Sequence, residues 1–117
     1  YRSIAAAGRQ LETMCREADL VVAATDDPLG QAQLCHHAYV AGTPFVSCAL
    51  YEKAAAGEVL LVVPGAGTPC WSCATGQGGI ARTAPKDYGT GRLVDELALG
   101  PSIHLVAEVA AGLAVSL

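Results

Sequence analysis

The feature that most constrains the fold is a strand–helix–strand pattern over residues 19 to 51. It opens with "DLVVAAT", in which Leu20 to Ala24 is an unbroken apolar run rather than an alternating one. Such a run is typical of a strand that helices cover on both faces. A second apolar segment, "TPFVSCALY", carries Pro44 at its edge. Two strands joined by a helix favour a parallel pair, so the pattern predicts a three-layer α/β fold.

The helix between these strands has clear start and stop signals. Asp27 suits the N-cap position and Pro28 suits the first helical position. Gly42 is a natural stop. Between the signals, four side chains recur at helical spacing: Leu29, Gln33, His36 and Val40.

Three further elements are predicted. A helix over residues 8 to 18 follows from the shared face of Leu11, Met14 and Cys15, and "GEVLLVV" predicts a third strand that Pro64 and Gly65 end. Residues 76 to 93 are rich in Gly, Thr and Pro, which indicates a loop. The final segment predicts a helix with one apolar face, formed by Ile103, Val106, Ala110, Leu113 and Leu117.

Composition excludes several classes of protein. The 117 residues are 52% hydrophobic but only 5% aromatic, so an aliphatic core is expected. A net charge of −4 argues against a nucleic-acid partner, which needs a basic face. No apolar run reaches the ~18 residues of a membrane span, so no membrane partner is expected. Five cysteines without a framework of spacings fit a reducing compartment, and hence a cytoplasmic location.

Both ends of the sequence suggest a piece of a larger domain. The chain begins with Tyr1 and ends at Leu117 inside an apolar stretch. A partial sheet exposes strand edges and apolar helix faces. We therefore expect the chain to bury them by self-association, as a homo-oligomer.

The sharpest local feature is the sequence Thr25-Asp26-Asp27, which follows the first buried strand. Ligands of open α/β sheets bind outside the carboxyl ends of the strands. Two carboxylates at that place can hold Mg²⁺, which takes oxygen ligands and bridges to phosphates. Capping of the next helix is the simpler interpretation and is preferred for Asp27. For Asp26 both interpretations stay open.

The segment "TPCWSCAT" places Cys70 and Cys73 at a spacing that lets two thiolates face one tetrahedral metal ion. The pair has three interpretations: half of a zinc site, a redox dithiol, or two loop thiols without function. A redox pair usually sits at a helix N-terminus, which lowers the thiolate pKa. Pro69 before the pair and the glycine-rich loop after it do not suggest such a helix, while Trp71 suggests a packed knuckle.

Taken together, these segments resemble a known family. "ADLVVAATDD", a helix, "AGTPFVSCALY" and "GEVLLVVPGAGTPCWSC" stand in the order found in the later part of the adenylation domain of the ThiF/MoeB/HesA family, the bacterial relatives of ubiquitin-activating enzymes. The resemblance covers residues 18 to 75, and "ALGPSIHLVAEVAAGLAVSL" resembles the helix that follows there.

The resemblance implies a Rossmann-like three-layer sandwich with a mainly parallel sheet. Residues 1–117 would form one partial adenylation domain whose ATP-loop half, with its arginine and lysine, lies upstream. The activity implied is ATP-dependent transfer of AMP to the C-terminal glycine of a ubiquitin-like or sulfur-carrier protein, with release of pyrophosphate. Asp26 falls on the magnesium-coordinating aspartate of the ATP site, with Asp27 beside it. Cys70 and Cys73 fall on the first zinc pair, whose partners come from a second Cys-x-x-Cys.

The sequence also departs from the family pattern. Asp27 replaces an asparagine, no second cysteine pair occurs before Leu117, and residues 76 to 100 contain no thioester-forming cysteine. We therefore expect the chain by itself not to adenylate anything. Two alternatives remain: a non-catalytic ThiF-like scaffold or heterodimer half, and a Rossmann-type nucleotide-dependent oxidoreductase.

Overall fold

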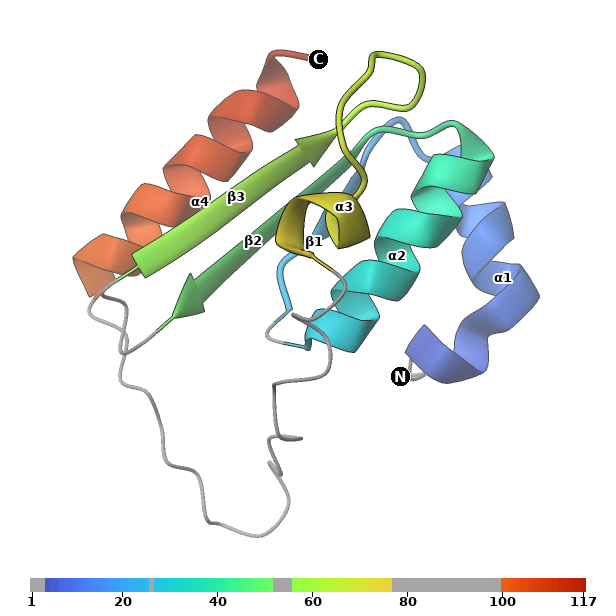
Figure 1. Ribbon diagram of the computed structural model, residues 1–117, viewed down its shortest axis with the longest axis horizontal. Helices are drawn as coiled ribbons and strands as arrows, with labels where there is room; N and C mark the ends of the chain where they lie inside the picture. The colour runs from blue at the N-terminus through green and yellow to red at the C-terminus, as the bar shows by residue number, and fades with distance from the viewer. Residues whose placement is uncertain (1–3, 26, 52–55, 77–99) are drawn as a thin grey trace, which may run out of the picture.

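The computed structural model describes residues 4–25, 27–51, 56–76 and 100–117, which form a mixed α/β fold around a three-stranded sheet (Figure 1). The elements follow in the order α1 (Ile4–Glu17), β1 (Val21–Ala23), α2 (Pro28–Ala41), β2 (Phe45–Tyr51), β3 (Ala56–Val62), α3 (Trp71–Thr75) and α4 (Gly100–Val115). The predicted glycine-rich loop lies almost wholly outside the described residues.

The sheet has the order β1-β2-β3. β1 and β2 are parallel, with Val21 opposite Phe45, which confirms the prediction for this pair. β2 and β3 are antiparallel, with Phe45 opposite Val62. The expected mainly parallel sheet is therefore wrong for the described strands. Only residues 52–55 separate β2 from β3, whereas a parallel crossover needs about a dozen residues.

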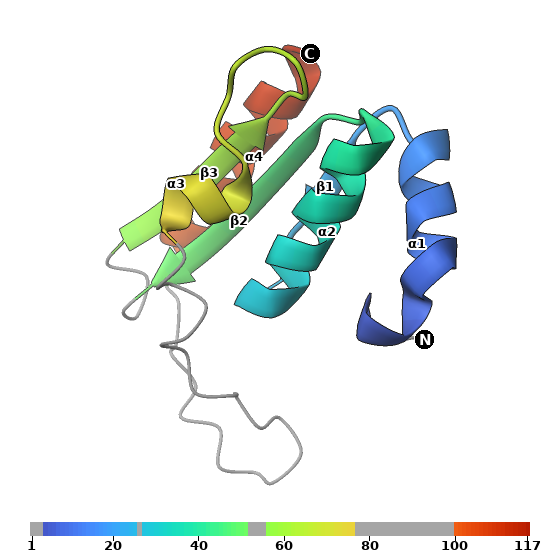
Figure 2. The same cartoon turned by 45° about the vertical axis from the view of Figure 1, so that its right-hand side comes forward.

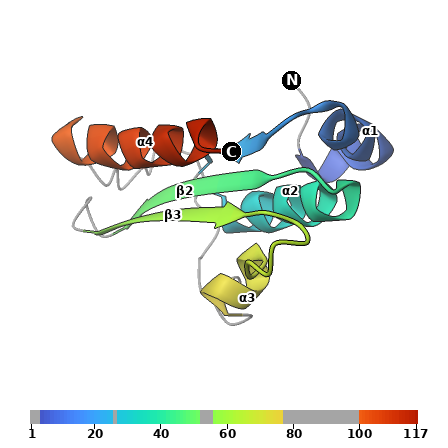
Figure 3. The same cartoon turned by 90° about the horizontal axis from the view of Figure 1, so that it is seen from above.

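Helices cover both faces of the sheet. Figure 3 shows β2 and β3 between α4 on one side and α3 on the other. α2 contacts β1 and β2 and also packs against α3, while α1 packs against α2. The main core lies on the α2–α3 side, where every neighbouring element contributes a buried side chain: Leu11, Cys15, Ala23, Cys35, Ala38, Phe45, Val62 and Trp71.

β1 is less buried than its apolar run predicts. Val21 and Ala23 lie on the same side of the sheet as their partners Phe45 and Ser47, against the main core. Val22 points to the other side and is 53% exposed. The reason is that α4 packs over β2 and β3 on that side, and β1 is an edge strand of the described sheet.

α1 begins earlier than predicted and is kinked. The helix starts at Ile4 and its backbone breaks from helical geometry at Gly8 (φ 32°, ψ −114°). Leu11 and Cys15 are buried as expected, but Met14 is 64% exposed. Leu11 and Cys15, four positions apart, are enough to cover α2. The buried face of α1 is therefore narrower than the face that the sequence predicts.

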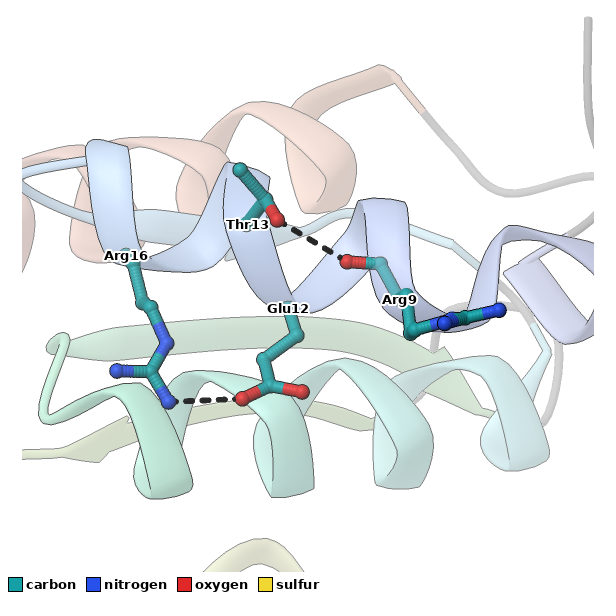
Figure 4. Close-up of polar contacts among 4 residues, drawn as sticks. All are labelled: Arg9, Glu12, Thr13 and Arg16. Carbon is teal, nitrogen blue, oxygen red and sulfur yellow. Dashed lines mark hydrogen bonds and ion pairs between the residues drawn. The ribbon is translucent and has the colours of Figure 1, made fainter.

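The exposed side of α1 carries two local contacts (Figure 4). Arg16 donates to Glu12 Oε1 across 2.8 Å, and the Thr13 hydroxyl donates to the Arg9 carbonyl across 3.2 Å. The Arg16 guanidinium lowers the pKa of Glu12 through the hydrogen bond and its charge. Because the pair is exposed and one turn apart, it contributes little to stability.

The end of α2 is fixed as the sequence predicts. Gly42 adopts the left-handed conformation (φ 78°), and its N–H donates to the Tyr39 carbonyl across 3.1 Å. The next residue, Thr43, is buried and donates through its hydroxyl to the Cys15 carbonyl across 2.6 Å. The helix stop therefore also ties α2 to the end of α1.

α4 packs with a shorter apolar face than predicted. Ala110 is buried and Val106 and Leu113 are half-buried, but Ile103 and Leu117 are 45% and 55% exposed. The sheet under the helix has only two strands, so it covers the middle of α4 and not its ends. Among the described residues, none of the helices combines the length and the apolar character that crossing a membrane requires.

We predict opposite effects for two glycine substitutions at this interface. A Cβ at Gly57 would collide with Cγ2 of Val106, whose χ1 is stiff in a helix, so Gly57→Ala is expected to lower the free energy of unfolding by about 1–3 kcal/mol. Gly112 lies in α4 with nothing near a new Cβ, so Gly112→Ala is expected to raise it by about 0.5–1 kcal/mol. Urea denaturation measures both. Equal effects of the same sign would contradict this packing.

Candidate functional site

Several strands and helices end or begin at one edge of the sheet. β1 and β2 are parallel, so their carboxyl ends point to the same edge, although β1 ends opposite Ser47 and β2 continues to Tyr51, opposite which β3 begins. α2 and α4 both begin at this edge, on opposite sides of the sheet (Figures 1 and 2). The first turns of a helix have unpaired N–H groups and a partial positive charge. Two such turns therefore begin at this edge, but in α2 Pro28 has no N–H and the Leu29 N–H already donates to Asp27.

Asp27 is the N-cap of α2, as predicted. Its backbone is extended (φ −94°, ψ 104°), and its Oδ1 accepts from the Leu29 N–H across 3.1 Å. Its own N–H donates to the Thr25 hydroxyl across 3.4 Å. One carboxylate oxygen is thus used in capping. Asp26, the other predicted carboxylate, lies outside the described residues.

Gln31 is a functional candidate that the sequence analysis missed. Its side chain is only 3% exposed, on the face of α2 that meets the sheet. Its amide nitrogen donates to the carbonyl oxygens of Thr25 and Cys48, the latter across 3.3 Å, and its Oε1 accepts from the Trp71 indole N–H across 3.1 Å. A buried glutamine needs partners for both ends of its amide. The only sequence signal was an amide at a core-facing helical position.

The cysteine pair lies at the start of a helix, so the expectation that no helix begins there is wrong. Cys70 is the N-cap of α3, and its carbonyl accepts from the N–H groups of Cys73 and Ala74 across 3.0 and 2.9 Å. A five-residue helix is too short to show a periodic pattern in the sequence. Trp71 is 3% exposed, so the expectation that it is packed is confirmed, in a helix rather than a knuckle.

The two sulfur atoms of the pair interact directly. They lie 3.3 Å apart, with Cys70 half-buried and Cys73 exposed. A Cys70 thiolate accepts hydrogen bonds from the Cys73 thiol and from the Cys73 backbone N–H, which lowers the pKa of Cys70. The same interaction raises the pKa of Cys73. The geometry therefore makes Cys70 the more acidic thiol of the pair, and the sequence argument against a redox pair no longer holds, because the pair does lie at a helix N-terminus.

A third cysteine contacts the helix that carries the pair. Cys35 of α2 is 2% exposed, and its Sγ accepts from the Trp71 backbone N–H across 3.4 Å. Burial raises the pKa of Cys35, so this thiol stays protonated and acts as a core residue. Its contact with Trp71 fixes the first turn of α3 against α2.

The pair fits a metal ion only in part. Cys70 and Cys73 supply two thiolates of a tetrahedral shell. Within the part of the chain that the structure describes, no group of three His, Cys, Asp or Glu side chains converges. Among these residues, the predicted zinc site therefore has only its two cysteine ligands.

A separate hollow of about 300 Å³ lies on the opposite side of the sheet, between β3 and α4. Its lining is apolar or backbone only: Gly57, Val59, Leu105, Val106 and Val109. Among the described residues, its lining offers van der Waals contacts and no side chain for acid–base or nucleophilic chemistry.

Comparison of the chain with models of protein families, with curated proteins and with solved structures finds no match.

The thiol pair predicts an order of reactivity. In chain freed of metal, Cys70 is expected to react with iodoacetamide at lower pH than an ordinary thiol, because the thiolate is the nucleophile and its pKa is lowered. Cys73→Ala removes one hydrogen bond to that thiolate, so the midpoint of the Cys70 profile should move to higher pH. Mass spectrometry of each peptide across pH measures this. A Cys70 profile that Cys73→Ala leaves unchanged would rule out the interaction.

Proposed function

We propose that the chain carries the later part of a ThiF/MoeB/HesA-type adenylation domain. In the intact enzyme this Rossmann-like domain transfers AMP from ATP to the C-terminal glycine carboxylate of a ubiquitin-like or sulfur-carrier protein. The main support is the order of elements: a parallel strand ending at Ala23, a helix capped by Asp27, a second parallel strand, an antiparallel strand, and then Cys70 and Cys73. This is the order of the motifs that carry the resemblance.

The sheet edge offers suitable chemistry for this reaction. Transfer of AMP requires ATP and the acceptor carboxylate to be held in line and the phosphate charge to be neutralised. The first turns of α2 and α4 begin at this edge, and helix N-termini stabilise phosphates. A bound Mg²⁺ would supply charge neutralisation at the phosphates. Asp26 is the proposed ligand of that ion, and Asp27 holds the start of α2.

We assign the cysteine pair to a structural role in the same domain. Cys70 and Cys73 would hold half of a zinc site, completed by a second pair from elsewhere in the protein or from a partner chain. Two thiolates alone leave half of the shell to water, which is weak for a structural ion. In the completed site, the metal would fix α3 and its buried Trp71 against α2.

A second candidate function is thiol–disulfide exchange, favoured by the 3.3 Å separation of the two sulfur atoms. The Cys70 thiolate would attack a small disulfide such as oxidised glutathione and release one glutathione thiolate. The Cys73 thiolate would then displace the second glutathione and leave a Cys70–Cys73 disulfide.

The two assignments of the pair predict different results with the purified protein. A zinc site predicts one zinc per chain by elemental analysis where the second pair is present, and thiols that resist oxidised glutathione. A redox pair predicts no retained zinc and release of two glutathione thiols per disulfide formed, with a mass loss of two hydrogens. Zinc held tightly by the 117-residue chain alone would refute the half-site.

The nucleotide assignment is tested at Asp26. Asp26→Asn keeps the shape of the side chain but removes the charge that holds Mg²⁺. We expect ATP–pyrophosphate exchange by the intact enzyme to be abolished and the melting temperature to change little, because Asp27 and not Asp26 caps α2. The control Asp27→Ala loses the cap on Leu29, so it should cost roughly 1 kcal/mol of stability with a milder effect on turnover. Near-normal exchange in Asp26→Asn would contradict the proposal.

A further inference from the structure

One side of β3 has no partner strand among the described residues. β3 is the last strand in the order β1-β2-β3 and pairs only with β2. Edge strands are usually short, interrupted by a bulge, or protected by Pro or Lys. β3 has none of these features: its seven residues pair with β2 in unbroken register, and Glu58 is its only charged residue. The other edge strand of the described sheet, β1, has only three residues. The free side of β3 is therefore well suited to pair with another strand.

An apolar surface borders this free side. Gly57 and Val59 of β3 line the hollow together with Leu105, Val106 and Val109 of α4. The lining includes residues of β3 and none of β2, so the hollow lies on the β3 flank of α4. Leu105 and Val109 are 64% and 47% exposed there. A partner that joins β3 can therefore bury apolar side chains of α4 in the same interface.

We propose that the free side of β3 and the β3 flank of α4 form an interface with a second copy of the chain. A two-fold axis beside β3 relates the two copies. The two β3 strands run antiparallel and join the two sheets into one continuous sheet. This inference does not depend on the proposed function, and it gives a surface to the self-association that the sequence predicts.

The spacing of the layers favours a second copy as the partner. α4 contacts both β2 and β3, so it lies over this pair of strands. Neighbouring strands are about 4.8 Å apart, which places α4 about one strand spacing from the two-fold axis. α4 and its copy are then about 10 Å apart, a distance at which helices pack against each other. A second copy thus supplies both a strand for β3 and a helix for the exposed side chains Leu105 and Val109.

One register of the two β3 strands is self-complementary. With Val59 opposite the partner's Val59, Gly57 faces the partner's Leu61 on the α4 side of the sheet, so a large side chain meets the position without one. On the other side of the sheet, Glu58 faces the partner's Leu60. A register centred on Glu58 would instead place two carboxylates opposite each other, which is unfavourable. The interface is therefore expected to be centred on Val59.

Sedimentation equilibrium tests the interface. We expect the mass to rise with concentration from that of the 11.9 kDa chain to twice this value. Leu105→Glu adds two carboxylates near the two-fold axis without removing a buried side chain, so the dissociation constant of the dimer should rise by about tenfold or more. Val109→Glu, on the same flank, should act in the same direction. The matched control is Val115→Glu, at an 88% exposed position of α4 outside the hollow, which should stay within about twofold.

Backbone hydrogen exchange identifies the strand involved. In an antiparallel pair, every second N–H of β3 points away from β2. At concentrations where the chain is dimeric, these amides should be protected. On dilution, or in Leu105→Glu, they should exchange about tenfold faster or more. The amides of β3 that donate to β2 should keep their protection, which shows in the same spectra that the variant is folded.

The outcomes decide the proposal in either direction. Dimers that Leu105→Glu and Val109→Glu weaken and Val115→Glu does not, with faster exchange at alternate amides of β3, support it. A chain that stays monomeric at millimolar concentration overturns it, and protected alternate amides in that monomer would mean that the chain itself covers β3. A dimer that both flank variants leave intact, or that the control weakens equally, also overturns it, because the interface then lies elsewhere.

Discussion

The central strand β2 is the element on which the rest of the structure depends. Phe45 and Val46 are fully buried although they point to opposite faces of the sheet, and Ser47 is 2% exposed. β2 pairs with β1 on one side and β3 on the other, and it contacts α2 on one face and α4 on the opposite face. Without this two-sided burial neither helical layer would have a surface to cover.

The two faces are filled in different ways. On the α2–α3 side, large side chains such as Phe45 and Trp71 interlock with small ones such as Ala23 and Ala38. On the α4 side, the helix approaches closely because Gly57 offers no side chain and Ala110 a small one. This close approach keeps the contact between α4 and the sheet narrow. Leu105 and Val109 lie beside this contact, where they line the hollow between β3 and α4 and are 64% and 47% exposed.

The candidate site draws its order from polar contacts rather than from the apolar core. The Gln31 backbone N–H donates to the Asp27 carbonyl across 3.0 Å, and the Gln31 Oε1 accepts from the Trp71 indole, so hydrogen bonds connect the start of α2 to α3. α3 carries both the indole and the cysteine pair. Gln31 therefore links the end of β1 to the helix that carries the Cys70–Cys73 pair.

The sequence by itself determined the local features. Asp27, Pro28 and Gly42 set the two ends of α2 because capping depends on residues next to each other in the chain. The unbroken apolar runs located β1 and β2, and the helix between them indicated their parallel pairing. The spacing of Cys70 and Cys73 showed that their sulfur atoms could meet.

The tertiary structure alone decided which faces are covered and which polar groups meet. The exposure of Val22 depends on where α4 lies, and the antiparallel pairing of β3 depends on how the chain turns back after β2. The partners of Gln31 lie 6, 17 and 40 residues away along the chain. No periodicity or local motif records such distances, because burial and hydrogen bonding between remote residues arise only when the layers pack.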